Sequence, residues 1–63
     1  MDIEIVRRVM AEFREMPGLR LTVAQATRLW GIEQDVCHRV IEALVASAFL
    51  RWTASGLVVR AES

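Results

Sequence analysis

The stretch TVAQATRLWGIEQDVCHRVI, residues Thr22 to Ile41, decides the fold of this 63-residue chain. Thr22 and Gln25 have the spacing of a capping box, in which each side chain bonds to the backbone amide of the other, so we expect a helix over residues 23–30. Gly31 stands where a helix commonly ends in a left-handed residue. Only residues 32–33 separate it from a second helical pattern. So short a link predicts that the two helices turn sharply against each other.

Apolar side chains recur every three or four residues on both sides of this turn, which is typical of helices that cover a core. The spacing predicts a helix over about residues 2–16, ended by Pro17-Gly18, and another over about residues 34–48. We expect Ala26 and Leu29 of the middle helix to point at the core, and Leu44 to lie in the middle of the apolar face of the third helix.

The hydrophobic period changes from helical to alternating after residue 48. Leu50-Arg51-Trp52 and Leu57-Val58-Val59 flank Thr53-Ala54-Ser55-Gly56, a turn-like cluster that ends in glycine. Two alternating runs joined by a short link with glycine predict a β-hairpin, here over about residues 49–60. The extended Arg20-Leu21 segment is expected to add a short third strand.

The order helix, helix, helix, hairpin resembles the bacterial winged helix-turn-helix domains over nearly the whole chain. The resemblance is most specific in Leu21-Thr22, Leu29-Trp30-Gly31-Ile32 and Ala48-Phe49-Leu50-Arg51. It implies an α+β, mostly helical fold in which residues 1–63 form one domain with a C-terminal two-stranded wing. In that family a glycine often stands at the position of Ala48, and Ser or Thr often stands at the position of Glu33.

The same resemblance implies a small DNA-binding transcriptional regulator. Its third helix would lie in the major groove, with the hairpin on the adjacent backbone. Gln pairs well with adenine, Arg with guanine, and Asp accepts from cytosine, so the polar residues at the start of that helix suit base contacts. The DNA-contacting residues implied in this way are Gln34, Asp35, His38 and Arg39 on the third helix, Thr22 and Arg28 on the second, and Arg51 and Thr53 on the hairpin.

Composition favours a different function. The eight arginines are balanced by eight acidic residues, and there is no lysine, whereas nucleic-acid binders usually have a basic excess. Residues 33–48 carry Glu33, Asp35 and Glu42 against Arg39, a net charge of −2. The hydrophobic content of 54% exceeds what so small a core easily buries, which favours a homodimer. The alternative function is therefore a protein-interaction or dimerisation module that uses the same fold without nucleic acid.

The sequence gives no sign of catalysis or of metal, cofactor or small-molecule substrate binding. Cys37 is the only cysteine, and the adjacent His38 points about 100° away from it around the helix, so the two do not converge. No apolar run approaches the roughly 20 residues that span a bilayer, and no signal peptide opens the chain. We therefore expect a cytoplasmic, non-enzymatic protein with no membrane contact.

Overall fold

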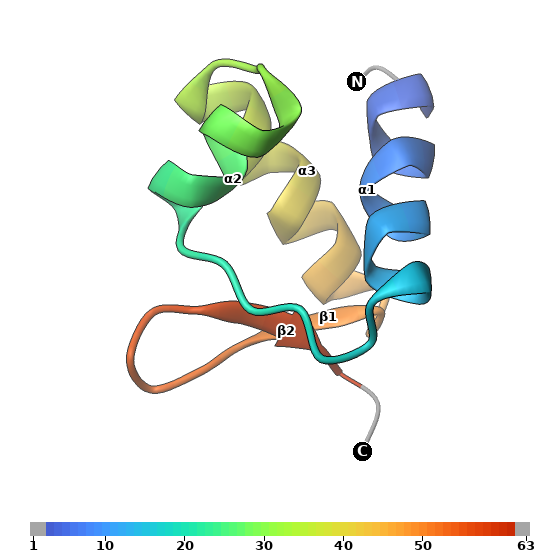
Figure 1. Cartoon of the computed structure of the whole chain (residues 1–63), viewed down its shortest axis with the longest axis vertical. Helices are drawn as coiled ribbons and strands as arrows, with labels where there is room; N and C mark the ends of the chain where they lie inside the picture. Colours follow the sequence, from blue (N-terminus) through green and yellow to red (C-terminus); the bar gives the residue numbers. More distant parts are fainter. Residues whose placement is uncertain (1–2, 62–63) are drawn as a thin grey trace.

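The computed structural model describes residues 3–61, and these form three helices followed by an antiparallel hairpin (Figure 1). The elements are α1 (Ile3–Glu15), α2 (Val23–Trp30), α3 (Gln34–Ala46), β1 (Leu50–Trp52) and β2 (Val58–Arg60). The predicted α+β, mostly helical fold is confirmed. Helix α2 has the predicted bounds, and α1 ends one residue before the predicted residue 16. The predicted start of the first helix at residue 2 lies outside the described residues.

Local hydrogen bonds define both ends of α2. The Gln25 amide donates to Thr22 Oγ1 over 3.1 Å, and the Thr22 amide donates to Gln25 Oε1 over 3.0 Å, which confirms the predicted capping box. At the other end, Gly31 has φ +64° and donates its amide to the Thr27 carbonyl over 2.9 Å. Glycine adopts this conformation without a steric penalty because it has no Cβ. The sequence prediction for this helix is thus correct at both ends.

Helix α3 ends at Ala46, so the predicted bound of residue 48 is wrong. The reason lies in Ala48, which has the left-handed φ of +65°. The Phe49 amide donates back to the Leu44 carbonyl over 2.9 Å, which is the long hydrogen bond of a Schellman motif. This motif ends the helix and directs the chain into β1. Ala48 thus occupies a position at which an L-residue with a Cβ is strained.

We expect the substitution Ala48→Gly to raise the free energy of unfolding by about 1 kcal/mol, because glycine adopts a positive φ without strain. Ala11→Gly is the matched control. Ala11 is exposed in the interior of α1, and glycine there should lower the free energy of unfolding by about 1 kcal/mol. Urea unfolding followed by far-UV circular dichroism measures both variants. Equal losses at the two positions would contradict the left-handed conformation of residue 48.

Strands β1 and β2 form the predicted hairpin, in which Arg51 stands opposite Val59. The connecting turn is closed by the Thr53 amide, which donates to the Leu57 carbonyl over 2.8 Å. Gly56 in this turn has φ +84°. The glycine of the predicted turn is therefore where a left-handed residue is needed.

The predicted third strand at Arg20-Leu21 is present only as one bridging residue. The Leu21 amide donates to the Val58 carbonyl over 3.2 Å, and the Val58 amide donates to the Leu21 carbonyl over 2.7 Å. This pair of bonds joins the segment before α2 to the hairpin, so Arg20 lies beside β2 although it is far from it in the sequence.

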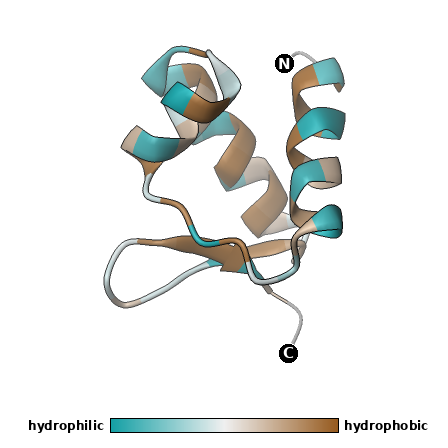
Figure 2. Cartoon of the chain, viewed as in Figure 1, coloured by the Kyte–Doolittle hydropathy of each residue, from teal (hydrophilic) through white to brown (hydrophobic). Residues whose placement is uncertain are grey.

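The core lies between the three helices and one face of the hairpin. Figure 2 shows hydrophobic stretches along α3 and along the strands. Leu44 is 4% exposed and Ala26 is fully buried, so their predicted core positions are confirmed. Cys37 is also fully buried. The buried apolar cluster consists of Val9, Phe13, Leu21, Ala26, Trp30, Cys37, Val40, Ile41, Leu44, Leu50 and Val58.

The predicted core position of Leu29 is wrong. Leu29 is 47% exposed, whereas the adjacent Trp30 is 3% exposed. Trp30 follows the buried Ala26 by four residues, so it shares the core-facing side of α2. Its ring packs edge-to-face on Phe13 of α1, with centroids 6.3 Å apart, and Arg8 Nη1 donates to its carbonyl over 3.3 Å. The larger side chain thus takes the core position and leaves Leu29 at the edge.

Candidate nucleic-acid interface

Four of the predicted DNA-contacting residues lie together on the exposed side of α3. Gln34, Asp35, His38 and Arg39 are all exposed, and they line one open surface hollow of about 540 Å³. Their spacing of one, three and one residues places them on one side of a helix. The structure therefore brings this predicted set together on a single accessible surface.

The first turn of α3 is acidic. Glu33 occupies the N-cap position but makes no side-chain hydrogen bond to the helix. Asp35 Oδ1 accepts from the Val36 amide over 2.9 Å. Negative side chains stabilise the positive end of a helix, but they also oppose a phosphate at the same place. This end of α3 is consequently a poorer phosphate site than a helix N-terminus without carboxylates.

His38 connects α3 to the hairpin. Its ring lies on that of Trp52 in β1, with centroids 6.0 Å apart and planes inclined by 34°. His38 Nε2 also lies 3.9 Å from Glu42 Oε2, one helical turn further along. The contact with Trp52 was not predicted, since no spacing in the sequence marks a pair that only the packing of two elements brings together. It gives the hairpin a direct contact with the candidate interface.

The two predicted threonines have hydrogen bonds within their own turns. Thr22 Oγ1 accepts from the amide of Gln25 in the capping box. Thr53 Oγ1 accepts from the Leu57 amide over 3.0 Å and lies 3.2 Å from Ser55 Oγ. Both hydroxyls therefore stabilise the local backbone.

Arg28, in the last turn of α2, is exposed.

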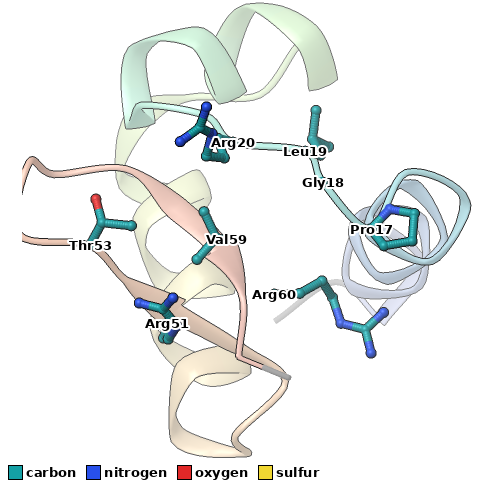
Figure 3. Close-up of a pocket in the computed structure, with 8 residues that line it drawn as sticks. All are labelled: Pro17, Gly18, Leu19, Arg20, Arg51, Thr53, Val59 and Arg60. Carbon is teal, nitrogen blue, oxygen red and sulfur yellow. The ribbon is translucent and has the colours of Figure 1, made fainter. Parts of the chain in front are cut away.

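Arg51 lies apart from the polar residues of α3. Neighbouring residues in a strand point to opposite faces, and Trp52 contacts His38 of α3, so Arg51 points away from that helix. It lines a second hollow together with Arg20 and Arg60 (Figure 3). The two hollows share no lining residue. Six of the eight predicted DNA-contacting residues thus divide between the two hollows, and Thr22 and Arg28 line neither.

Cys37 faces the core of the molecule. It is fully buried, and burial raises the pKa of its thiol above the ordinary value. A raised pKa lowers the fraction of the nucleophilic thiolate. Within residues 3–61, no three His, Cys, Asp or Glu side chains gather as metal ligands would. Over the same residues, each helix is too short or too polar to cross a membrane.

Comparisons with protein-family models, with curated proteins and with solved structures give no match for this chain. Its function is therefore argued from the geometry and charge of the surfaces described above.

Proposed function

We propose that the protein is a winged helix-turn-helix DNA-binding regulator of the cytoplasm, with α3 in the major groove and the hairpin beside the backbone. One observation supports this above the others. Gln34, Asp35, His38 and Arg39 form a continuous exposed polar surface on the second helix of a sharply turned pair. The second helix of such a pair is commonly the one that enters a groove. The proposed activity is binding and involves no catalysis.

Three polar side chains of α3, Gln34, His38 and Arg39, have a role in this proposal. Arg39 pairs with guanine and Gln34 with adenine, each through two hydrogen bonds. The contact between His38 and Trp52 sets the position of the hairpin relative to α3. Arg28, in the last turn of α2, contacts a phosphate. In this proposal α3 contacts the DNA bases, and the elements beside α3 contact the DNA phosphates.

The charges on the protein predict that it binds DNA weakly. With Arg28 on a phosphate and Arg39 adding a second positive charge in the groove, about two counterions should be released, which corresponds to a log–log salt slope of about −2. Glu33 and Asp35 lower the affinity further, because both carboxylates lie in the first turn of the helix that faces the DNA. The low affinity comes from this acidic turn together with the small number of cations.

A double substitution tests the proposal. Duplexes are first selected from a random library at low salt, and binding is then measured by fluorescence anisotropy. Replacing Glu33 and Asp35 with Ser removes two repulsive charges, each worth about 0.3–1 kcal/mol near a helix end, so affinity should rise by about threefold to thirtyfold. Arg39→Gln should weaken binding about tenfold and relax the preference at one base pair. Arg14→Gln, a charge change on α1, is the matched control and should leave binding unchanged.

If selection enriches no duplex and the double variant gains no affinity, α3 does not face DNA. The protein-interaction function then replaces the proposal.

The second candidate function, a dimerisation module, is favoured by an apolar hollow between α1 and α3. It has a volume of about 380 Å³ and is lined by Ile3, Val6, Met10, Ala43, Leu44 and Ser47. Ile3 at its edge is 62% exposed, although it is one of the larger apolar side chains. We propose that the same α1–α3 surface of a second copy of the chain packs against this hollow. Such a contact is isologous and closes as a homodimer.

Sedimentation equilibrium at micromolar concentration tests the homodimer. The wild-type chain should sediment as a dimer, and Ile3→Arg should shift it to monomer because a charge enters the apolar contact. Met16→Arg, at an exposed apolar residue outside the hollow, should remain dimeric. A monomeric wild-type protein would rule out this candidate, and dissociation by both variants would rule out the α1–α3 hollow as the contact.

A further inference from the structure

A basic hollow lies on the hairpin face that points away from α3. Its volume is about 410 Å³, which falls within the ~300–1,000 Å³ typical of small-molecule sites. Three segments line it: residues 17–20 between α1 and α2, residues 51 and 53 in and after β1, and residues 59–60 of β2. In Figure 3, Val59 lies in the middle, with Arg20 on one side, Arg51 on the other, and Arg60 towards Pro17. This surface is separate from the one proposed to contact DNA.

Every ionisable side chain among the described lining residues of this hollow is positively charged. Three of the chain's eight arginines line it, and none of the eight described lining residues is acidic. Arg20 and Arg51 are exposed, and within residues 3–61 neither forms an ion pair with a carboxylate. Like charges that lie within about a Debye length (~8–10 Å) of each other repel, and a bound anion relieves this repulsion. The chain as a whole has zero net charge, so the positive charge of this hollow is a local excess.

Backbone pairing places Arg20 and Arg51 at the hollow, and a side-chain contact restrains Arg60. The two hydrogen bonds between Leu21 and Val58 position Arg20 beside β2. Pairing of Arg51 with Val59 sets the position of the second arginine. The guanidinium carbon of Arg60 lies 4.5 Å from the centroid of the Phe49 ring, a cation–π contact that restrains the third. The backbone positions of Arg20 and Arg51 are therefore fixed by the bridged segment and the hairpin, whereas the Arg60 guanidinium lies at Phe49.

We propose that this hollow binds the phosphoryl group of a phosphorylated small molecule, with Arg20 and Arg51 as its principal ligands. Guanidinium groups bind phosphoryl oxygens in pairs of parallel hydrogen bonds, a geometry that lysine cannot provide. The apolar side chains of Pro17, Leu19 and Val59 line the rest of the hollow and suit an uncharged part of the ligand. This site goes beyond the proposed function, because it uses a different face and does not require that α3 bind DNA.

The test is a titration of the ¹⁵N-labelled protein with inorganic pyrophosphate, followed by amide chemical shifts. Shifts should concentrate at residues 17–20, 51–53 and 58–60. Arg20→Gln and Arg51→Gln should each weaken binding about tenfold, as expected when one charge-assisted hydrogen-bond partner is lost. Arg51→Lys keeps the charge but not the paired hydrogen bonds, so it should recover only part of the affinity. Arg7→Gln, a change at an exposed arginine of α1 that lies outside this hollow and outside the surface proposed to contact DNA, should leave pyrophosphate binding as in the wild type.

A parallel titration with oligothymidylate that lacks terminal phosphates identifies the source of the phosphoryl group. Binding of pyrophosphate that depends on Arg20 and Arg51 supports a small phosphorylated ligand. Binding of the oligonucleotide alone, with the same dependence, retains the phosphoryl site but assigns the group to a nucleic-acid backbone. If neither probe binds, or if binding survives the Arg20→Gln/Arg51→Gln double variant, the proposal is wrong. Arg39 does not line this hollow, so Arg39→Gln should leave the pyrophosphate titration unchanged, and a failure of the DNA proposal remains distinguishable from a failure of this one.

Discussion

Replacing Leu44 with Ala should lower the free energy of unfolding by about 2–5 kcal/mol, the usual cost of removing a large buried side chain. Leu44 is 4% exposed and packs within the buried cluster from the last turn of α3. A folded domain is typically stable by about 5–15 kcal/mol, and a chain of 63 residues buries a smaller fraction of its surface than larger domains do. The substitution should therefore remove a large part of the total stability.

Leu29→Ala provides the matched control, because the same atoms are removed from a side chain that is 47% exposed. Its effect should stay below about 1 kcal/mol, since exposed substitutions rarely cost more than a few tenths to one. Urea unfolding of both variants, fitted with a common m-value, gives the comparison. Equal losses for Leu29 and Leu44 would contradict the orientation of α2, and no loss for Leu44 would contradict that of α3.

Trp30→Ala should destabilise the protein by about 3–5 kcal/mol. The indole is 3% exposed, joins α2 to α1 through its edge-to-face contact with Phe13, and is among the largest side chains of the core. Trp52 serves as the control because it is only partly buried against His38. Trp52→Ala should cost less than Trp30→Ala in the same urea titration.

Trp30→Phe separates the packing of the indole from its polarity. Trp30 Nε1 is buried and finds no hydrogen-bond acceptor among the described residues. An unpaired buried donor costs about 1–3 kcal/mol, so a phenyl ring that lacks this group should recover much of the stability lost in Trp30→Ala. If the Trp30→Phe and Trp30→Ala variants had equal free energies of unfolding, the unpaired N–H would contribute little to the stability of the protein.

Local signals determined the helices and the turns. Helix α2 begins after the Thr22–Gln25 capping box and ends before Gly31, as predicted. The glycine of the hairpin turn, Gly56, lies in the predicted turn and has a left-handed φ. These features act over a few residues, because a cap or a left-handed residue satisfies backbone groups within its own turn. The exposure of Gln34 and Arg39 was predictable for a similar reason, since the apolar period of α3 assigns one side of the helix to the core.

The tertiary structure alone decided which residues meet across elements. Periodicity assigned Leu29 to the core, whereas in the structure the neighbouring Trp30 takes the core position and packs on Phe13. Packing of Trp52 on His38 set which face of the hairpin meets α3. Because Trp52 faces α3, Arg51 faces away from it. The bridge from Leu21 to Val58 places Arg20 beside the hairpin, so Arg51 lines a hollow together with Arg20. A sequence pattern specifies a side chain's direction from its own element, whereas its partners depend on how the elements pack.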